Sequence, residues 1–428
     1  MNISKDLIAQ ILDRISLVEV VGEQIPLERK GKHYLARCPF HHEKTPSFTV
    51  FAESGRFQCF GCGEKGDAIA FLMKREGLPF PEVVKRLAER AGIALPISQM
   101  DSVTQSHKNR GYSLHKIAAT YFAQTLFSPA GAVALAYLHE TRGLPIQVIK
   151  ELGLGFAPNS FDSLKNHLLK QGFSEDELLS YALCKKGTRG QTYDAFRNRV
   201  TFPIEDIHGN IVAFGGRALD NTRPKYLNSS ETPLFHKGQH LYGLCRAKKS
   251  NAEQLILCEG YLDVITLHAA GITNAVAPLG TALTMEQATL LKKHTHRVLL
   301  NFDSDNAGLC ATERALSILD KVGVPAKVVT LEKAKDPDEF IKTFGKDAYI
   351  QVLARGVPGF LFRMNRVLSK YDLSKLDEKI QGAKAVVALI AESPSAIIRD
   401  IYADLASEHL GISKEALLSD VTHLLHSK

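Results

Sequence analysis

Between residues 251 and 345, segments with the apolar pattern of a strand alternate with segments that have the pattern of a helix. Short apolar runs typical of buried strands are separated by patterns in which apolar residues recur every three or four positions, as in helices. The four strand-like runs are QLILCE (254–259), NAVAPLG (274–280), RVLLNFD (297–303) and AKVVTL (326–331). Strands that alternate with helices predict a parallel sheet with crossover helices on its faces.

The rest of the chain divides into segments with other patterns. Residues 1–97 combine helical patterns with a central block rich in Gly, Cys and aromatic residues, which predicts short strands. Residues 98–111 are polar, which indicates a linker, and residues 112–250 mix helical patterns with short strands. Residues 346–428 show helical patterns throughout. We therefore predict a multidomain α/β protein with a small N-terminal domain, a basic mixed α+β subdomain, a parallel-sheet subdomain (251–345) and a C-terminal helical bundle.

Composition excludes several classes of protein. The 428 residues are 45% hydrophobic and 23% charged, and the mean hydropathy is −0.08, as in soluble globular proteins. No apolar run reaches the roughly 18 residues of a membrane span, and the charged start MNISKDLIAQ differs from a signal peptide. Seven cysteines, an odd number, fit a reducing compartment better than a disulfide framework.

The formal net charge of +7 is concentrated in the middle of the chain. Residues 101–250 hold 19 basic and 12 acidic side chains, whereas residues 251–428 hold 20 basic and 22 acidic ones. A basic segment followed by a carboxylate-rich one fits a protein that holds a polyanion beside a metal site. A charge of +7 is also ordinary for a chain of this length, so charge alone does not establish nucleic-acid binding.

Two residue pairs in the N-terminal segment have the spacing of zinc ligands. Cys38 and His41 form C-x2-H, and Cys59 and Cys62 form C-x2-C, with seventeen residues between the pairs. Four such ligands predict one tetrahedral Zn²⁺ that is closed to substrate, so its role would be structural. Spacing alone leaves two rivals of His41 open, and the remaining cysteines are interpreted as small core residues. The rivals are His42 and His33, and the other cysteines are Cys184, Cys245, Cys258 and Cys310.

Acidic residues follow three of the four predicted strands. They are Glu259 after the first strand, Asp303 and Asp305 after the third, and Asp336 and Asp338 after the fourth. Because the carboxyl ends of parallel strands share one edge of a sheet, these carboxylates should lie together and repel one another unless a cation neutralises them. Oxygen ligands without His or Cys favour Mg²⁺ or Mn²⁺, and the arrangement indicates metal-assisted phosphoryl transfer.

One further carboxylate and one alternative belong to this interpretation. Asp263 lies one helical turn after Glu259 and can face the same site. Asp305 and Asp336 are also good helix N-caps, so for any single aspartate a capping role is about as plausible as a metal-binding role.

Cations and aromatic residues are interleaved in the basic segment. The run FRNRVTFPI would place Arg197 and Arg199 on one strand face, and three more cations follow at Arg217, Lys225 and Lys237. Cations for phosphates and aromatic faces for bases together indicate a platform for single strands or nucleotides. The alternative is a charged surface over a core that contains the aromatic side chains. Those side chains are Phe196, Phe202, Phe214, Tyr226 and Phe235.

These motifs together resemble the bacterial DnaG-type DNA primases. The block CPFHHEKTPSF…FQCFGCGEKGDAIAF is similar to the CHC2-type zinc ribbon of that family. The blocks FRNRVTFPI, GNIVAFGGR and PKYLNSSETPLFHKG are similar to its polymerase subdomain, and EGYLDVI, APLGTALT, LNFDSDNAG and KDPDEF to its Toprim subdomain. The resemblance covers nearly the whole chain in the family's order.

The resemblance implies a function and an assignment of residues. It implies synthesis of short RNA primers on single-stranded DNA from ribonucleoside triphosphates, with one structural zinc and two catalytic Mg²⁺ or Mn²⁺ ions. Glu259, Asp303 and Asp305 would hold the catalytic ions, and Asp263, Asp336 and Asp338 would support them. The residues that match basic positions of the family and would grip nucleotide or template are Arg142, Arg197, Arg199, Arg217, Lys225 and Lys237.

The resemblance also carries expectations about partners. Family members usually continue into a helical domain that docks on the replicative helicase, and because this chain ends at Lys428 we expect that domain to be absent. We further expect a monomer that acts in the bacterial cytoplasm at the replication fork and has no membrane partner.

Two other functions compete with primer synthesis. One is a different Toprim enzyme, such as a topoisomerase or a nuclease; a type IA topoisomerase needs a Tyr nucleophile in a separate gate domain, for which the segment after residue 345 is short. The other is a non-catalytic zinc-ribbon protein that binds DNA, in which the clustered carboxylates would be an unexplained electrostatic cost.

Overall fold

The computed structural model describes residues 5–41, 43, 45–76, 78–93, 99–250, 252–393 and 395–426. The chain forms two compact units, one up to His107 and one from Lys108 onward, and each is described by itself. We call them the N-terminal unit and the C-terminal unit. None of the helices in the described residues is long and apolar enough to cross a membrane.

The N-terminal unit packs helices against an antiparallel meander. Its five strands lie in the order β1-β2-β3-β4-β5. Phe48, Phe57 and Phe71 form the aromatic centre of its core, with ring centroids 5.0–6.0 Å apart. The elements are α1 (Lys5–Arg14), α2 (Leu17–Gly22), β1 (Glu28–Lys30), β2 (His33–Ala36), β3 (Phe48–Phe51), β4 (Arg56–Cys59), β5 (Lys65–Gly66), α3 (Ala68–Glu76) and α4 (Phe80–Ala91).

The stretch predicted as a linker is helical from Gln99 onward. It forms the first half of α5 (Gln99–Leu126), and the boundary between the two units falls within it. The second half of α5 is anchored in the core by Leu114, Phe122 and Leu126. A polar segment can continue a helix that is already anchored, without having an apolar face of its own. The sequence pattern therefore did not reveal that this segment is helical.

The C-terminal unit begins with a four-stranded antiparallel sheet in the order β11-β10-β9-β6. Helices and a small β7–β8 hairpin surround this sheet. The elements are η1 (Pro129–Gly131), α6 (Ala132–Ala136), η2 (Tyr137–Thr141), α7 (Ile146–Glu151), β6 (Gly155–Ala157), α8 (Ser163–Lys170), α9 (Glu175–Ser180), β7 (Cys184–Lys186), β8 (Thr192–Asp194), β9 (Arg199–Glu205), β10 (Ile211–Ala218), β11 (Tyr226–Asn228), η3 (Lys237–Gln239) and α10 (Leu244–Lys249).

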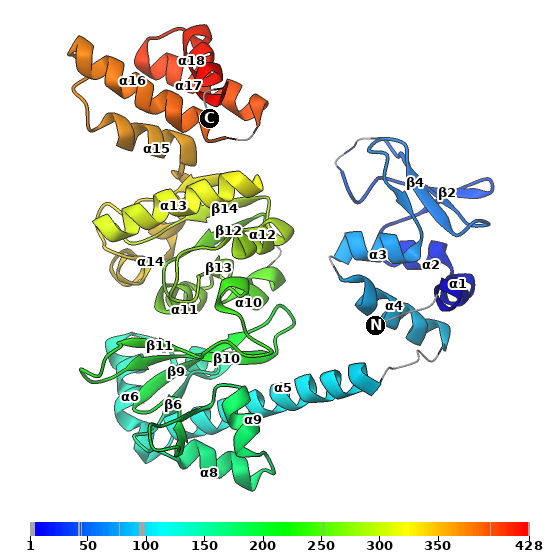
Figure 1. The fold of residues 1–428 in the computed structure, drawn as a ribbon, viewed down its shortest axis with the longest axis vertical. Helices are drawn as coiled ribbons and strands as arrows, with labels where there is room; N and C mark the ends of the chain where they lie inside the picture. The colour runs from blue at the N-terminus through cyan, green and yellow to red at the C-terminus, as the bar shows by residue number, and fades with distance from the viewer. Residues whose placement is uncertain are drawn as a thin grey trace. The chain divides into compact units, whose positions relative to one another are not determined.

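The second sheet of this unit has the predicted parallel topology. Its order is β13-β12-β14-β15-β16, with β13, β12, β14 and β15 parallel. One face packs against α11 and α14, and the other against α12 and α13, as Figure 1 shows. The elements are β12 (Gln254–Leu257), α11 (Tyr261–Ala269), β13 (Ala275–Val276), α12 (Met285–His294), β14 (Arg297–Leu300), α13 (Asn306–Val322), β15 (Ala326–Val328) and α14 (Pro337–Ala354).

The two sheets share one hydrophobic core. Phe202 and Phe214 of the first sheet belong to the same cluster as Tyr261 and Val264 of α11. The hydroxyl of Tyr261 donates to the Oδ1 atom of Asn228 on β11, so a polar bond crosses the same contact. The mixed subdomain and the parallel sheet therefore support each other rather than folding around separate cores.

The chain ends in a helical bundle with its own core. Its four helices are α15 (Gly359–Leu368), α16 (Leu376–Ala391), α17 (Ala396–Leu410) and α18 (Lys414–His426). The helical prediction for residues 346–428 missed the two-residue strand β16 (Val357–Pro358), which pairs antiparallel with β15. That strand is too short to leave a periodic pattern in the sequence, and it attaches the bundle to the edge of the sheet.

Candidate active site and zinc centre

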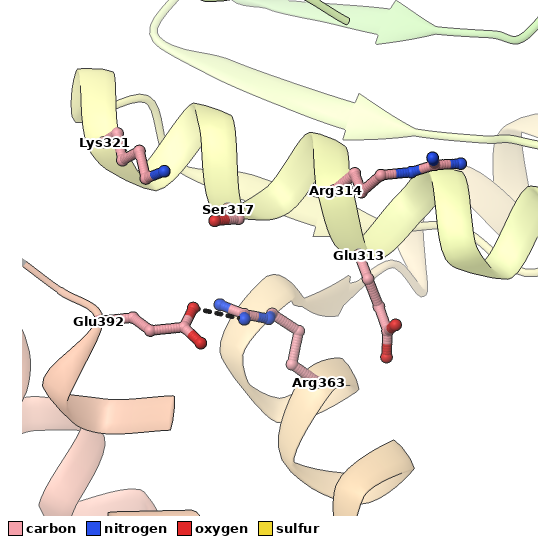
Figure 2. Close-up of a pocket in the computed structure, with 6 residues that line it drawn as sticks. All are labelled: Glu313, Arg314, Ser317, Lys321, Arg363 and Glu392. Atoms are coloured by element: carbon pink, nitrogen blue, oxygen red, sulfur yellow. Dashed lines mark hydrogen bonds and ion pairs between the residues drawn. The ribbon is translucent and has the colours of Figure 1, made fainter. Parts of the chain in front are cut away.

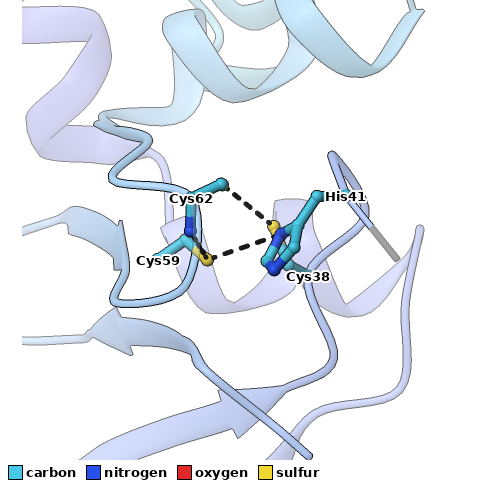
Figure 3. Close-up of side chains that lie close together, drawn as sticks. All are labelled: Cys38, His41, Cys59 and Cys62. Atoms are coloured by element: carbon cyan, nitrogen blue, oxygen red, sulfur yellow. Dashed lines mark hydrogen bonds between the residues drawn. The ribbon is translucent and has the colours of Figure 1, made fainter. Parts of the chain in front are cut away.

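The four predicted zinc ligands converge in the N-terminal unit (Figure 3). Their ligand atoms all lie within 4.8 Å of one another. The Sγ atoms of Cys38 and Cys62 are 3.8 Å apart, and the Sγ atom of Cys59 is 3.8 Å from the Nδ1 atom of His41. Four ligands at about 2.3 Å from one tetrahedral ion would be separated by about 3.8 Å, so the group fits Zn²⁺.

Strand ends and turns position these ligands. Cys59 ends β4, and the backbone N–H of Cys62 points at its sulfur, 3.4 Å away, in a tight turn. At Gly61 a Cβ atom would lie 2.7 Å from the Nε2 atom of His41, so only glycine leaves room for the imidazole. Of the rival ligands, His42 lies outside the described residues, and His33 packs its ring on Phe51 instead.

Glu43 organises the zinc group and was not predicted from the sequence. Its carboxylate lies 3.3 Å from the Nε2 atom of His41 and accepts hydrogen bonds from the backbone N–H of Cys38 at 2.7 Å and of Ser47 at 3.0 Å. A carboxylate on the second nitrogen of a ligating histidine fixes its ring and leaves Nδ1 for the metal. The only signal in the sequence is that Glu43 lies two residues after His41.

The thiols of this group differ in acidity. Burial raises the pKa of Cys38 to about 12. Burial also acts to raise the pKa of Cys59, but hydrogen bonds from the Ser47 hydroxyl and from backbone N–H groups outweigh it, and the pKa falls to about 7. A metal that binds here must therefore displace a proton at Cys38, whereas Cys59 offers a thiolate more readily.

The predicted carboxylates lie where the parallel strands end. Glu259 follows β12, Asp303 and Asp305 follow the adjacent β14, and Asp336 lies in the loop after β15. Because these strands are neighbours, the four side chains share the carboxyl edge of the sheet. In the described part of the chain, the zinc group is the only place where three or more possible metal-ligand atoms lie close together. The carboxylate oxygens at the sheet edge are therefore farther from one another than the four zinc ligands are.

Electrostatics shows that these carboxylates interact. Burial raises the pKa of Asp303 to about 6, and repulsion from Glu259 and Asp336 adds to this shift. The Nζ atom of Lys335 lies 3.9 Å from both Asp303 and Asp305 and opposes it. These side chains offer only oxygen ligands, and their negative charges outnumber the nearby positive charge, so the edge fits a divalent metal ion. Lys335 was not predicted, because its position beside Asp336 carries no spacing signal.

Asp305 and Asp336 cap helices, as the alternative interpretation held, and Asp263 does so as well. Asp305 accepts from the N–H of Gly308 at 2.9 Å, Asp336 from that of Glu339 at 2.8 Å, and Asp263 from that of Gly260 at 3.1 Å. Each cap uses one carboxylate oxygen, so the second oxygen of Asp305 and Asp336 can still face a metal. Asp263 is 8% exposed, and burial, with repulsion from Asp336 and Asp303, raises its pKa to about 8.

Asp338 pairs with Arg142, and it also repels Asp263, whose pKa this helps to raise. The Nη1 atom of Arg142 donates to Asp338 at 2.7 Å, and Lys342 and Thr266 donate to the same carboxylate. Three donors leave this side chain little capacity for a metal. Arg142 also donates from Nε to the hydroxyl of Tyr137, so both residues take part in the contact between the two sheets' subdomains.

Arg197 and Arg199 do not share a strand face. Strand β9 begins at Arg199, and Asn198 before it has a positive φ of 50°, which breaks the extended backbone. Arg199 is buried and donates to the carbonyl of Lys225. Arg197 instead stacks on the exposed ring of Phe161, with its guanidinium carbon 3.9 Å from the ring centroid.

The remaining predicted cations differ in the contacts that their side chains make. Arg217 lies over the ring of Tyr137 at 4.3 Å and near Tyr226 at 5.9 Å. Lys225 is exposed and Lys237 is half-buried, and neither ammonium pairs with a carboxylate in the described part of the chain.

Most of the interleaved aromatic residues belong to the core. Phe196, Phe202, Phe214 and Phe235 are at most 2% exposed, so they cannot stack on a nucleic acid. Only Tyr226, 41% exposed, is available at the surface. The sequence showed aromatic residues beside cations but not which face of each strand they occupy, and the alternative of a packed core is correct for these four.

Comparison with known proteins identifies each part of the chain. Residues 3–103 match the family model described as CHC2 zinc finger, and residues 121–248 match the N-terminal domain of the DNA primase catalytic core. Residues 256–341 match the Toprim-like model. The zinc-finger match and the four-ligand group together assign a zinc site, and the Toprim match implies that the chain binds a divalent metal.

The prediction that the chain lacks a helicase-binding domain is wrong. Residues 360–415 match the family model described as the DnaB-helicase binding domain of primase. These residues include most of α15, all of α16 and α17, and the first two residues of α18. The prediction was based on the last residue, Lys428, whereas the matched segment lies within the helices that were interpreted only as a bundle.

Curated relatives and solved structures agree with this assignment. The DNA primase of Clostridium acetobutylicum is 38% identical over 97% of this chain and 69% of its own length, and that of Synechococcus elongatus is 38% identical over 94% of this chain and 60% of its own. The structure of the Aquifex aeolicus primase zinc-binding and RNA polymerase domains matches 97% of this chain and 99% of that one, with 31% identity and a TM-score of 0.63. A DNA primase domain from Pseudomonas aeruginosa matches 74% of this chain and 99% of that one, with 35% identity and a TM-score of 0.68. The chain therefore belongs to the DnaG-type bacterial DNA primases, nucleotidyltransferases that synthesise RNA primers for DNA replication.

Proposed function

We propose that this chain extends short RNA primers on single-stranded DNA, using ribonucleoside triphosphates and two divalent metal ions held by Glu259, Asp303 and Asp305. The observation that carries this proposal is the group of carboxylates at the ends of neighbouring strands, where burial raises the pKa of Asp303 to about 6 and repulsion from Glu259 and Asp336 adds to the shift. Bound cations would relieve that repulsion. Mg²⁺ or Mn²⁺ would lower the barrier to attack of the primer 3′-hydroxyl on the α-phosphorus and stabilise the leaving pyrophosphate.

The supporting aspartates act by holding these ligands in place. Asp263 accepts the N–H of Gly260 and so fixes the turn that follows Glu259. Asp336 caps α14 at the same edge and adds negative charge beside Asp303. Asp338 fixes Arg142, and the bond between them keeps the carboxylate edge in register with the basic subdomain.

The cations of the basic subdomain would bind template and nucleotide in two ways. Lys225 and Lys237, with no carboxylate partner in the described residues, are suited to phosphate groups. Phe161, with Arg197 stacked on it, offers a surface on which a base can stack. Arg199 and Arg217 would act by shaping the sheet beneath these groups. A DnaG primase catalytic domain solved with bound single-stranded DNA is 34% identical over 73% of this chain, with a TM-score of 0.64, and this supports the assignment.

We assign the other partners by the same family match. One structural zinc would stabilise the N-terminal unit, which would help to read the template. The segment 360–415 would bind the replicative helicase, and the protein would act as a monomer at the replication fork in the bacterial cytoplasm.

Primer synthesis by the purified chain tests the proposal. The assay contains single-stranded DNA, ribonucleoside triphosphates and Mg²⁺ or Mn²⁺, and it compares the chain with the variant Asp303→Asn/Asp305→Asn. We expect metal-dependent synthesis of short RNA, and we expect its rate to be at least about 100-fold lower in the variant. Removing a residue that only orients a metal ligand costs up to about 100-fold, so removing two ligands should cost at least as much. Template affinity should stay within about twofold, since the basic residues are intact.

A matched variant controls for loss of charge. Asp176→Asn removes an exposed carboxylate of α9 that has no partner in the described residues, and it should leave synthesis unchanged. Cleavage or relaxation of DNA in place of RNA synthesis would identify another kind of Toprim enzyme. Template binding without chemistry, equal in all variants, would identify a non-catalytic DNA-binding protein.

A further inference from the structure

The helix α13 joins the carboxylate edge to the C-terminal helices. It begins directly after Asp305, which caps it, and it ends at Val322. Its 17 residues make it about 25 Å long at 1.5 Å per residue. A tilt of only about 3° at one end would move the other end by about 1 Å, a displacement that is costly in an active site.

The first turn of α13 is locked to the catalytic loop. The side chain of Asp305 accepts the N–H of Gly308 at 2.9 Å. The backbone of Gly308 lies directly against the carbonyl of Asp303, so closely that no Cβ atom would fit there. Asp303, Asp305 and the helix therefore move together.

The last turns of α13 are held by an arginine of the helical bundle. Arg363 on α15 places its Nη2 atom 2.6 Å from Glu392, at the turn between α16 and α17, and its Nη1 atom 3.9 Å from Asp320 on α13. Its side chain is only 14% exposed. A second ion pair, between Arg366 and Glu313, joins the same two helices at 2.9 Å.

Charged and polar side chains line a cavity where these ion pairs lie. Figure 2 shows the residues that line this cavity, which come from α13, from α15 and from the turn that contains Glu392; Arg363 extends from α15 toward Glu392. Its volume is about 360 Å³, and its lining side chains are all charged or polar. They are Glu313, Arg314, Ser317, Lys321, Arg363 and Glu392. At this end ion pairs therefore join α13 to α15, in addition to the apolar contacts that Gly359 and Phe362 of α15 make with the core around Leu316.

We propose that Arg363 is a positioning residue for catalysis: by tying Asp320 to Glu392 it sets the angle of α13, and through α13 it sets the place of Asp303 and Asp305 and their affinity for divalent metal. This inference rests on the proposed role of those two carboxylates. Without the guanidinium, the two ion pairs that join Asp320 on α13 to Glu392 are lost. Arg363 also opposes the rise in the pKa of Asp320, which burial and then repulsion from Glu392 cause, so its removal weakens the charged form of that carboxylate as a partner. Both Arg363 and Glu392 lie in the segment that matches the helicase-binding model.

Metal binding, measured separately from activity, tests the proposal. Mn²⁺ is titrated into the zinc-loaded chain by calorimetry, for the unmodified chain, Arg363→Ala and Arg363→Lys. We expect Arg363→Ala to weaken Mn²⁺ binding about three- to tenfold, below the 10–100-fold typical of residues bonded directly to a ligand. Arg363→Lys should restore part of the affinity, because an ammonium can pair with one of the two carboxylates but not bridge both.

A control and a partner variant separate positioning from folding. Arg399→Ala removes a bond to the Ser393 carbonyl within the bundle, and Arg399 forms no hydrogen bond or ion pair with α13 in the described residues, so the change should leave Mn²⁺ affinity unchanged. Asp320→Asn should reproduce the loss, and combining it with Arg363→Ala should add little, since both remove one contact. If Arg363→Ala does not fold, Arg363→Lys and Asp320→Asn carry the test.

The outcomes are distinguishable. Weakened Mn²⁺ binding with unchanged affinity for single-stranded DNA supports the proposal. Unchanged Mn²⁺ binding in folded Arg363→Ala or Asp320→Asn overturns it, and so does a loss that Arg399→Ala shares. Failure of the proposed function itself looks different, because Asp303→Asn/Asp305→Asn would then bind Mn²⁺ as well as the unmodified chain does.

Discussion

Arg142 and Asp338 pair across the two sheets of the C-terminal unit although they lie 196 positions apart in the chain. The Nη1 atom of Arg142 is 2.7 Å from the Oδ2 atom of Asp338, whose side chain is 7% exposed. Lys342 and Thr266 donate to the same carboxylate, at 2.9 Å and 2.5 Å. This bond ties the π-helical turn η2 of the basic subdomain to α14 of the parallel-sheet subdomain, so it aligns the nucleic-acid side of the protein with its carboxylates.

Replacing Asp338 should therefore cost stability. Asp338→Ala leaves Arg142 and Lys342 without their shared counter-charge, and breaking a buried pair in this way typically costs about 3–5 kcal/mol. We expect a loss near the lower limit, about 3 kcal/mol in the free energy of unfolding, because both cations can still reach water. Denaturant unfolding followed by circular dichroism measures it, with Asp347→Ala, exposed on the same helix, as the control. Equal stability of the two variants would contradict the assignment.

The sequence was most informative where a pattern is local. Strands and helices alternate within windows of a few residues, so the parallel sheet and its carboxylate edge could be predicted from β12 to β15. The spacing of Cys38, His41, Cys59 and Cys62 identified the zinc ligands in the same way, because two tight turns bring each pair together without help from the rest of the fold.

The sequence was least informative where a residue's role depends on distant partners. Arg142 and Asp338 each looked like a site residue, and only the fold shows that they bind each other. Phe202 and Phe214 have the same neighbours in sequence as a nucleic-acid platform, but the twist of the sheet and the helices around it bury them. Glu43 acts on His41 through a hydrogen bond that no spacing rule specifies.

Removal of zinc should unfold the N-terminal unit and spare the C-terminal unit. The strands β2 and β4 carry or adjoin three of the four ligands, and structural zinc sites contribute about 10–16 kcal/mol of apparent binding free energy in small domains. We expect Cys59→Ser to lose its zinc and to expose residues 28–66 to limited proteolysis. Native mass spectrometry and peptide mapping measure both effects.

A cysteine outside the zinc group is the control for that experiment. Cys310→Ser changes an exposed thiol on α13 and should keep one zinc and the same proteolytic pattern. Zinc retained by Cys59→Ser, or protection retained after zinc is lost, would contradict a structural role for the metal.

His115 should make the stability of the C-terminal unit depend on pH. It is fully buried between Tyr181 and Phe214, donates from Nδ1 to the carbonyl of Gly111 at 2.9 Å, and has no partner for Nε2 among the described residues. Burial lowers its pKa from 6.5 to about 4. Below pH 6.5 the unfolded chain therefore binds a proton that the folded chain does not, and stability falls as the pH drops toward 4.

Substitution by a side chain that does not titrate isolates this effect. The pKa difference corresponds to about 3 kcal/mol. When the pH is lowered from 7 to 4, the free energy of unfolding should therefore fall by about 3 kcal/mol less in His115→Leu than in the unmodified chain. Denaturant unfolding at several pH values measures the difference. His208→Leu, at an exposed histidine, should keep the slope of the unmodified chain. The same slope in His115→Leu would contradict the prediction.

Gly308→Ala should reduce metal-dependent synthesis although alanine is the better helix former. In an exposed helix this change would stabilise by about 1 kcal/mol. At Gly308 the new Cβ atom would overlap the carbonyl of Asp303, which is backbone and cannot turn aside, so the loop that carries Asp303 and Asp305 must shift. We expect at least a tenfold loss of primer synthesis and of Mn²⁺ affinity, with unchanged binding of single-stranded DNA. Gly22→Ala, whose Cβ atom would meet only a leucine methyl group at 3.9 Å, should show neither loss, and full activity of Gly308→Ala would mean that the position of this loop does not limit catalysis.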